Sequence, residues 1–411
     1  MSWMLGISVA LLGYTYLGYP ALIWALSRVR GRPVKKGPVA GGAAVLIAAH
    51  NEAESLPRKL KNLLELAKTE PIREIWIGLD GCTDGTGEEV RKTRDWRLET
   101  RDGRLETRDG RREAEDPSLK SGVSSLKSAP HVHVLEFEQR RGKAAVLNEL
   151  MAKAGQPILA MMDARQRVEA GAISALLENF ADPQVGAASG ALVYESAEGG
   201  AQKGAESYWG YEKFIRSCES RFWAVPGATG ALYAIRRELC RPIPENTLVD
   251  DVLIPMRAVL EGHRCLFEPS ARVFDLPTTN FSHENLRKRR TLAGIWQIFR
   301  LEPAIYCVFR NPIWFQWVSH KFLRLLTPFL VFLSVFSLGW MAWEGSGVLR
   351  ALFWGILAGV LASFLAFWGG KWISSRILGL MGAFWSVNWA LLRAAWDAAT
   401  GRFDARWMRR R

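Results

Sequence analysis

One stretch, residues 139–165, constrains the fold of this chain more than any other. A basic loop with one glycine, Arg140-Arg141-Gly142-Lys143, opens a helical segment, and the apolar run ILAMM at 158–162 then stops at Asp163. A short uncharged run between turn signals is typical of a buried, parallel strand. Because ligands of open α/β sheets bind at the carboxyl ends of the strands, Asp163 is a candidate ligand contact. An aspartate here is also a common turn residue or helix cap, so its place alone does not assign a role.

The overall composition fits one sizeable domain together with membrane segments. The chain has 411 residues, of which 49% are hydrophobic, and 18 tryptophans. Its formal net charge of +13 would suit nucleic acid, but long apolar runs accompany that charge. Cytoplasmic flanks and an anionic ligand explain it better than a nucleic-acid partner does. The five cysteines include no CxxC pair, which predicts neither a disulfide framework nor a zinc site and suits a reducing compartment.

The N-terminal segment, residues 1–27, contains no charged side chain. It is long enough to span a bilayer and lacks the basic start of a secretory signal. Basic residues follow at once, at Arg28, Arg30, Arg32, Lys35 and Lys36. An excess of Lys and Arg marks the cytoplasmic side of a span, so we expect an uncleaved transmembrane anchor and a cytoplasmic domain after it.

Strand-like and helical patterns alternate from residue 43 onward. The runs 43–49, 74–79 and 132–137 are typical of strands, and leucines at helical spacing predict a helix over 54–68. Such an order implies right-handed crossovers. The fold class expected is α/β, with a doubly wound, mixed sheet.

Acidic residues follow the first two of these strands. The first ends at His50-Asn51-Glu52, and the second runs directly into Asp80. Glu52 and Asp80 are therefore candidate ligand contacts at the same edge of the sheet as Asp163. Asp84, a little further on, is equally well explained as the cap of the next helix.

The second half of the domain supplies a glycine-bracketed loop, a pair of acids and a basic run. The loop Gly227-Ala228-Thr229-Gly230 suits a close approach of backbone to a ligand. Asp250 and Asp251 open a helix, where the helix dipole favours acids even without a function. The run Arg287-Lys288-Arg289-Arg290 fits contacts with lipid phosphates as well as a role at the substrate.

Residues 94–130 interrupt this pattern. The heptapeptide RLETRDG occurs at 97–103 and again at 104–110, and a run rich in Ser, Lys and Gly follows. The segment is mixed in charge and poor in large apolar residues. We therefore expect an exposed, mobile insertion inside a domain that extends over 38–302.

The C-terminal part of the chain is apolar. Residues 303–322 mix tryptophan with basic residues, which predicts an interfacial helix. The region 323–395 holds two uncharged runs long enough to span a bilayer, 325–343 and 351–370, and a shorter run, 377–392, that either spans or lies at the interface. The basic tail, 396–411, favours a cytoplasmic end, whereas three full spans after a cytoplasmic domain would place it outside.

Acids at several strand ends, a basic loop and an arginine cluster together suit a ligand that carries a diphosphate. Carboxylates and water are ligands for Mg²⁺ or Mn²⁺. Arg and Lys offset the charge that builds on a departing diphosphate, and a further Asp could deprotonate an acceptor hydroxyl. Neither G-x-x-x-x-G-K-[ST] nor G-x-S-x-G occurs, which disfavours a P-loop NTPase and a serine hydrolase.

Seven motifs follow one another in a fixed order. They are AAHNEAESL, GLDGCTDGT, RRGKAAVLN, MMDAR, GATGALYAIRREL, TLVDD and RKRRTLAG. In this order they resemble the membrane-bound, processive-type family 2 glycosyltransferases, which include cellulose, chitin-oligosaccharide, hyaluronan and poly-N-acetylglucosamine synthases. The resemblance covers 43–300 apart from the insertion, and the flanking apolar spans agree with it.

This resemblance implies a GT-A fold and an inverting transfer of a sugar from a nucleotide-diphosphate donor, usually a UDP-sugar. By position, Glu52 and Asp80 would hold the uridine, and Lys143 would lie near the base or the diphosphate. Asp163 would be the first acid of the family's Asp-x-Asp motif, near the diphosphate and its Mg²⁺ or Mn²⁺, and would be the metal ligand.

The resemblance also assigns the acceptor side. Asp251 would be the catalytic base, as the second acid of the pair that it forms with Asp250. The loop with Gly227, Thr229 and Gly230 would face the acceptor, with Asp250 beside it. Arg287 and Arg290 would take the first and fourth positions of the family's Gln-x-x-Arg-Trp motif, with Arg290 steadying the departing diphosphate.

Two positions depart from the family pattern. Arg165 stands where the second acid of Asp-x-Asp is expected, so either the cation is held by Asp163 with the diphosphate and water or the dependence on metal is weaker. Thr291 stands in place of the Trp that packs at the acceptor end, and Arg287 in place of the Gln. These changes bear on the acceptor and on processivity.

Three functions are therefore compatible with the sequence. The favoured one is a glycosyltransferase that extends a growing glycan at a bacterial-type plasma membrane, with its catalytic domain in the cytoplasm. The second has the same chemistry but adds a single sugar to a lipid-linked acceptor. The third is a non-catalytic membrane scaffold, for which Arg165 and Thr291 argue and Asp80, Asp163 and Asp251 argue against.

Overall fold

A mixed sheet of eight strands forms the centre of the computed structural model, which describes residues 1–411 except 102–128, 195–199, 276–280, 346, 370–375 and 402–411. In the described residues the strand order is β3-β2-β1-β4-β7-β6-β8-β5. The strands are β1 (Ala43–Ala49), β2 (Ile72–Asp80), β3 (His131–Phe137), β4 (Ile158–Met161), β5 (Arg167–Val168), β6 (Val185–Tyr194), β7 (Tyr233–Arg236) and β8 (Arg264–Asp275).

The sheet combines a parallel half with a mixed half. Strands β1 to β4 run parallel to one another. Strand β7 is antiparallel to both β4 and β6, β6 is parallel to β8, and β5 is antiparallel to β8. The expected doubly wound, mixed α/β sheet is therefore confirmed.

Helices cover both faces of the sheet because its central strands are apolar on both sides. All seven residues of β1 are buried, and Leu46 and Ile47 belong to separate hydrophobic clusters on opposite faces. One cluster includes side chains of α5 (Lys143–Lys153) and α8 (Asp250–Leu260), and the other includes α3 (Ser55–Leu66) and α6 (Ala172–Leu177). Burial of each such leucine or isoleucine contributes about 1.5–3 kcal/mol, so these faces fix the strands that carry the site.

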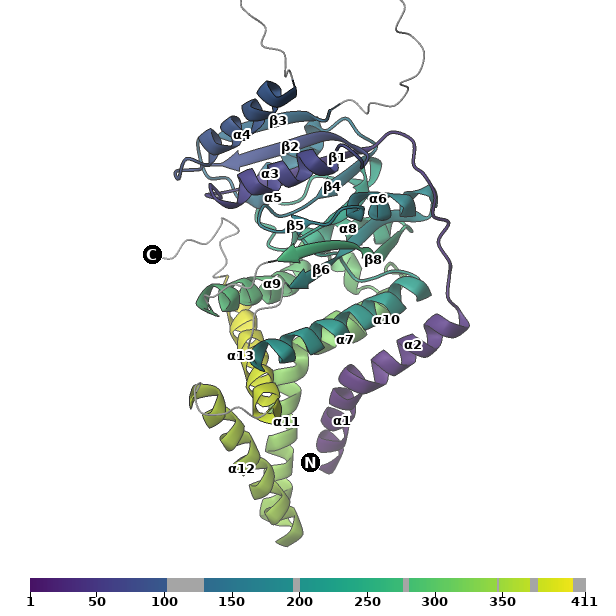
Figure 1. Ribbon diagram of the computed structural model, residues 1–411. Helices are drawn as coiled ribbons and strands as arrows, with labels where there is room; N and C mark the ends of the chain where they lie inside the picture. The colour runs from purple at the N-terminus through teal and green to yellow at the C-terminus, as the bar shows by residue number, and fades with distance from the viewer. Residues whose placement is uncertain (102–128, 195–199, 276–280, 346, 370–375, 402–411) are drawn as a thin grey trace, which may run out of the picture.

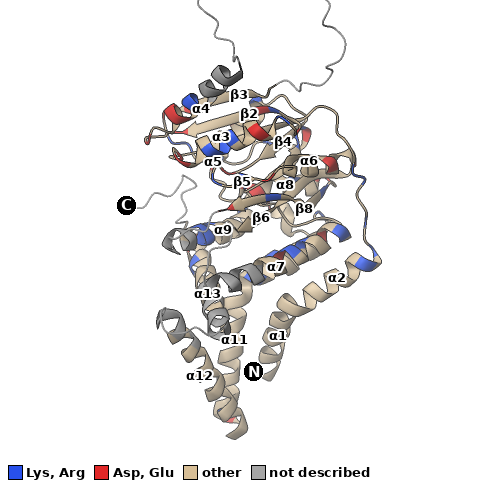
Figure 2. Ribbon diagram, in the orientation of Figure 1, with Lys and Arg blue, Asp and Glu red and all other residues tan. Residues whose placement is uncertain are grey.

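Long apolar helices lie at the end of the molecule away from β1 to β3 (Figure 1). They are α1 (Ser2–Gly13), α2 (Tyr19–Val29), α11 (Leu323–Glu344), α12 (Gly347–Gly369) and α13 (Arg376–Thr400). Figure 2 shows that charged residues gather on the sheet domain and on the helices next to it, while α1 and α11 contain almost none. Two segments in the described chain, Ser2–Val29 and Trp314–Glu344, are long and apolar enough to cross a membrane.

The expected C-terminal runs fall on helices, but the number of spans stays a prediction. The run 325–343 lies inside Trp314–Glu344, and 351–370 largely coincides with α12. Within α12, the apolar helical stretch Gly347–Ala362 is shorter than a full membrane span. Apolar side chains on α11 and α12 are largely exposed, among them Phe332 and Trp354, which suits contact with lipid.

The expected interfacial helix over 303–322 is wrong as a single element. A short 3-10 turn covers Pro303–Tyr306, and helical structure then starts again at Trp314 and continues into α11. The break follows from Asn311, whose side-chain oxygen accepts a hydrogen bond from the N–H of Ile313, and from Pro312, which lacks an N–H. Trp317 is fully buried instead of lying at a lipid surface.

The expected insertion begins later than its sequence suggests. Helix α4 (Thr86–Arg101) includes the first residues of the stretch that starts at Arg94. The expectation for 102–128 lies outside the described residues, and β3 follows at the edge of the sheet. Two further helices, α7 (Gly200–Phe222) and α9 (Phe281–Leu301), lie between the sheet and the apolar helices (Figure 1).

Candidate functional site

The carboxyl ends of parallel strands β1, β2 and β4 bring Glu52, Asp80 and Asp163 to one edge of the sheet. The loop after β1 turns through Asn51, whose φ is 55°, a left-handed value that asparagine tolerates. Its side-chain oxygen accepts a hydrogen bond from the N–H of Thr83 at 2.8 Å. Asp84 accepts one from the N–H of Thr86 at 3.1 Å, so it caps α4.

Asp80 supports the basic loop from within the protein. Its side chain is fully buried, and its two oxygens accept hydrogen bonds from the backbone N–H groups of Arg141 (2.6 Å) and Gly142 (2.8 Å). Gly142 has a φ of 97°, which an L side chain rarely adopts. Asp80 therefore acts on any ligand through the position of this loop, which leads directly into Lys143.

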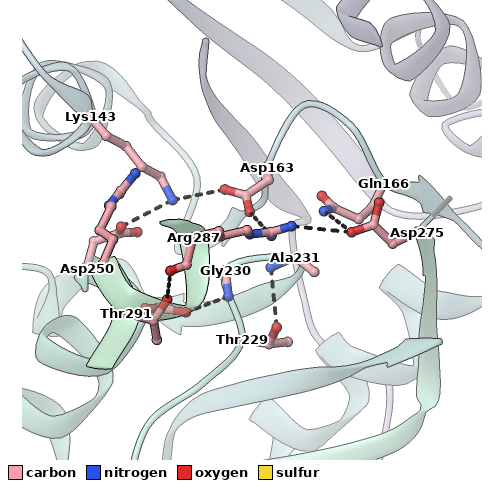
Figure 3. A network of polar contacts seen from close by, with 12 residues as sticks. Lys143, Asp163, Gln166, Thr229, Gly230, Ala231, Asp250, Asp275, Arg287 and Thr291 are labelled. Carbon is pink, nitrogen blue, oxygen red and sulfur yellow. Dashed lines mark hydrogen bonds and ion pairs between the residues drawn. The ribbon is translucent and has the colours of Figure 1, made fainter. Parts of the chain in front are cut away.

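Lys143 lies between two acids from different parts of the chain (Figure 3). Its Nζ is 3.0 Å from Oδ1 of Asp163 and 3.1 Å from Oδ1 of Asp250. Burial opposes the charge on this lysine, but the carboxylates of Asp163, Asp250 and Asp251 outweigh it and raise the lysine pKa. The ammonium is thus charged and held by two carboxylates.

Asp163 also faces an arginine from α9. Nη2 of Arg287 lies 3.6 Å from Oδ2 of Asp163, and Nη1 lies 3.6 Å from Oδ2 of Asp275. Asp275 in turn accepts a hydrogen bond from the side chain of Gln166 at 3.0 Å (Figure 3). Burial would raise the pKa of Asp163, but Lys143 and Arg287 hold it below its usual value, so this carboxyl is ionised.

Asp251 lies at the start of α8 and contacts the glycine-bracketed loop. The N–H of Gly230 donates to its Oδ2 at 2.8 Å, and its own carbonyl oxygen accepts from the N–H of Ala228 at 2.8 Å. A Cβ at Gly230 would lie 3.3 Å from Oδ2 of Asp251 and 3.4 Å from Oδ2 of Asp163. Both carboxylates therefore lie close to this backbone position, and a side chain there would press on them.

The proton affinity of Asp251 suits a base. Burial and the neighbouring Asp250 raise the pKa of Asp251 to about 6, although Lys143 acts in the opposite direction. A general base is most effective when its pKa is near the working pH. Asp250 is buried and bound to Lys143, so it does more in this structure than interact with the helix dipole.

Arg290 lies one turn after Arg287 on α9. Its Nη2 donates to the carbonyl oxygen of Leu248 at 3.3 Å, just before the pair of acids. The positive charge of Arg290 also lowers the pKa of Asp163, so Arg290 acts on the same carboxylate as Lys143 and Arg287. Thr291 is exposed, and its hydroxyl donates to the carbonyl oxygen of Arg287 at 3.1 Å (Figure 3). A short polar side chain thus occupies the position where the family pattern has a tryptophan.

Glu52 is half-buried at the border of the site. Burial raises its pKa, and the charge of Arg165 opposes that rise. Arg165 itself is exposed. It therefore brings a positive charge to the strand end where the family pattern has a second acid.

The side chains of this site do not fit a divalent cation held by the protein. Within the part of the chain that the structure describes, no group of three or more His, Cys, Asp or Glu side chains could hold a metal ion. Such cations take six or more oxygen ligands, and Asp163, the expected ligand, is bound by Lys143 and Arg287. We derive no chemical step through a cation.

Two residues that sequence patterns did not indicate hold the glycine-bracketed loop from behind. Arg216 of α7 donates through Nη2 to Oγ of Ser189 at 2.8 Å and to the carbonyl oxygen of Gly227 at 3.3 Å. Ser189 Oγ also accepts from the N–H of Thr229 at 3.1 Å. Ser189 lies inside an apolar strand and Arg216 on an amphipathic helix, so nothing in the local sequence marks them as supports of the loop. Their role is visible only from the contacts in the folded structure.

The sequence and the fold are similar to those of known glycosyltransferases. A family model described as "Glycosyl transferase family 2" matches residues 115–243. The poly-β-1,6-N-acetyl-D-glucosamine synthases of Staphylococcus aureus strains COL and N315 are each 22% identical to this chain over 262 residues, which are 62% of this chain and 52% of theirs. The chain thus spans about half the length of these curated relatives.

One solved structure resembles the chain over almost its whole length. The mannosyltransferase PcManGT from Pyrobaculum calidifontis, in complex with GDP-Man and Mn²⁺, matches with a TM-score of 0.68 at 21% identity. The match covers 97% of this chain and 100% of that one. At this identity the likeness shows a shared fold.

Proposed function

Because the chain carries a family 2 glycosyltransferase domain on a GT-A fold, we propose that it moves a sugar, with inversion, from a nucleotide-diphosphate donor to a hydroxyl of a growing glycan at the membrane. The donor is proposed to be a UDP-sugar. The observation that carries the proposal is the arrangement around Asp251. A buried carboxyl with a pKa of about 6 lies across Gly230 from Asp163, which Lys143 and Arg287 surround with positive charge.

In this proposal the donor binds along the strand ends. Glu52 borders the nucleotide, and Asp80 acts through the loop that it holds. Lys143 and Arg287, both at Asp163, interact with the diphosphate. Fixed positive charges that already face the site stabilise a diphosphate without reorganising during the reaction.

The transfer itself is a single displacement. Asp251 accepts the proton of the acceptor hydroxyl, and the acceptor oxygen forms a bond to the anomeric carbon of the sugar. The bond from that carbon to the diphosphate oxygen breaks, and its electron pair stays on the departing nucleoside diphosphate. Arg287 and Arg290 offset the negative charge that develops there.

The acceptor is proposed to lie at the loop with Gly227, Thr229 and Gly230, next to Asp250. This loop lies between Asp251 and helix α7, which faces the apolar helices (Figure 1). The two segments able to cross a membrane, Ser2–Val29 and Trp314–Glu344, support an action at the membrane surface with the domain in the cytoplasm. A nucleic-acid partner has no place in this proposal.

A single-sugar transferase acting on a lipid-linked acceptor is the second candidate. Thr291 favours it, because an exposed threonine offers no aromatic surface on which a long glycan could stack. A product carrying one added sugar would favour this candidate, and a ladder of products would favour chain extension.

The test is release of nucleoside diphosphate by the full chain, purified in detergent. A panel of UDP-sugars and GDP-mannose is offered in parallel to the wild type and to Asp251→Asn. We expect release from one donor, lost in the variant while donor binding remains, because only the base is removed. Turnover by Asp251→Asn close to that of the wild type would show that Asp251 is not the base. Equal silence of both proteins over the whole panel, with acceptor lipids present, would favour the scaffold.

The expected Mg²⁺ or Mn²⁺ has support from a relative of the same fold, but the specific ion stays a prediction. A relative of the same fold has Mn²⁺ in its complex, whereas the side chains here do not form a site for such an ion. In the proposed function a cation could enter only with the donor diphosphate, and Asp163 would be its ligand from the protein.

A further inference from the structure

The ammonium of Lys143 bridges two carboxylates in the way that a bound cation would. It lies 3.0 Å from Asp163 and 3.1 Å from Asp250, and the Asp250 side chain is only 6% exposed. The lysine starts α5, directly after the loop whose backbone Asp80 holds. Its position is therefore built into the fold and does not depend on a flexible surface side chain.

A second feature points the same way. The residue two positions after Asp163, where an acid would complete a pair of cation ligands, is Arg165. The other charged side chain at Asp163 is Arg287, at 3.6 Å. A divalent cation approaching Asp163 would meet positive charges from Lys143 and Arg287. Each of them repels it and neither can coordinate it.

These positive charges match the chemistry of a diphosphate. Lys143 supplies a compact ammonium, and Arg287 supplies a planar guanidinium that can donate two parallel hydrogen bonds to phosphate oxygens. Asp163 remains ionised between them and holds both cations at this strand end. In metal-dependent sites a divalent ion provides this positive charge.

We propose that this chain binds the diphosphate of its donor and transfers the sugar without a divalent cation, with Lys143, Arg287 and Arg290 providing the positive charge. The inference rests on the proposed function and goes beyond it. The displacement is unchanged: the electron pair of the broken carbon–oxygen bond stays on the diphosphate, and fixed side chains of the protein offset its charge. No oxidant, reductant or other reactant is needed.

The first experiment removes metal from the full chain in detergent. The protein is treated with EDTA and desalted, and release of nucleoside diphosphate is measured with EDTA, Mg²⁺ or Mn²⁺. We expect the rate in EDTA to remain close to the rate with metal. Lys143→Met should lose about 100-fold, as sites do when one preorganised donor is removed, and added metal should not restore it. A wild-type rate that collapses in EDTA and recovers with Mg²⁺ or Mn²⁺ would overturn the proposal.

The second experiment measures cation binding and does not depend on activity. Binding of Mn²⁺ to the protein in the presence of UDP or GDP is followed by electron paramagnetic resonance, with the nucleotide alone as the blank. We expect the wild type to bind no more Mn²⁺ than the blank and Arg165→Asp, which restores the missing acid, to gain a site. Arg167→Asp is the matched control, because it makes the same charge change without placing an acid beside Asp163.

The outcomes of this second measurement are distinct. Mn²⁺ bound by the wild type with nucleotide, as tightly as by Arg165→Asp, would contradict the proposal. Failure of the proposed function has a different signature, namely no release from any donor with or without metal. The Mn²⁺ measurement then still decides whether the site holds a cation.

Discussion

The backbone N–H of Gly230 donates a hydrogen bond of 2.8 Å to Oδ2 of Asp251. The glycine-bracketed loop thus orients the carboxylate that we assign as the base, and it leaves the other oxygen of that carboxylate for a substrate. The same glycine accepts a hydrogen bond from the N–H of Asp163 at 3.0 Å through its carbonyl oxygen. One residue therefore connects the base with the strand end that bears the diphosphate contacts.

The pH dependence of the rate should report on Asp251. Burial and Asp250 raise its pKa to about 6. A base works only when deprotonated, so kcat/KM should fall tenfold per pH unit below about pH 6 and level off above it. The measurement is kcat/KM from pH 5 to 8, with circular dichroism recorded alongside to confirm that the protein stays folded. A rate that stays constant down to pH 5 would contradict the assignment of this carboxyl as the base.

Gly230→Ala should lower turnover while the fold remains. The added methyl would lie 3.3 Å from Asp251 and 3.4 Å from Asp163, in the space between the two carboxylates. The carboxylates would have to move by a few tenths of an ångström, so we expect a loss smaller than the roughly 100-fold that a misplacement of about 1 Å costs. Gly210→Ala on α7 is the control, because its Cβ would meet nothing within 4 Å. Wild-type turnover in Gly230→Ala would show that this space is not used by the reaction.

Asp80→Asn should weaken both stability and donor binding. An asparagine has one accepting oxygen, so its NH₂ group would face one of the two N–H donors of the loop, at a cost of about 1–3 kcal/mol. We expect a lower thermal midpoint and a higher KM for the donor, because Lys143 follows that loop. Glu136→Gln is the control, since its ion pair with Arg91 is exposed and such pairs contribute little. An unchanged donor KM would mean that the loop does not position Lys143.

The strand ends and their acids were predictable because each follows from a local pattern. The apolar run before Asp163 gives a strand that is buried along its whole length, and parallel pairing then brings Asp163 and Asp80 to one edge. The partners of Asp80 were not predictable, because the sequence shows an acid but not the backbone amides that it binds. The ion pair of Lys143 with Asp250 joins residues 107 positions apart in the chain, and only the completed sheet brings them together.

The error at residues 303–322 has a local cause. A window rich in tryptophan and basic residues resembles an interfacial helix, but Pro312 and the side chain of Asn311 impose a new helix start. His320 then points inward, where its two ring nitrogens contact Glu219 and Glu212 of α7. Glu212 and Glu219 are buried because α7 packs against the segment Trp314–Glu344. The composition of either segment does not reveal this packing.

Arg216 should prove to be a positioning residue for the acceptor loop and, through it, for Asp251. It holds the carbonyl of Gly227 and the hydroxyl of Ser189, and that hydroxyl accepts the N–H of Thr229. Loss of these contacts in Arg216→Gln should loosen the loop and the hydrogen bond that it gives to Asp251. Because this hydrogen bond lowers the pKa of Asp251, the acid limb of the pH profile should move to higher pH, while kcat falls about 10-fold to 100-fold and donor KM stays the same.

Two further variants separate positioning by Arg216 from a general structural effect. Arg216→Lys keeps the charge but not the planar guanidinium that places Nη2 between Ser189 and Gly227, so it should recover part of the rate and of the pH profile. Arg221→Gln, on an exposed position of the same helix, should change neither. A fall in kcat for Arg216→Gln without any movement of the acid limb would mean that Arg216 supports the fold alone. A shift of the acid limb of the pH profile to higher pH would show that Arg216 of α7 influences the pKa of Asp251 through the loop that lies between them.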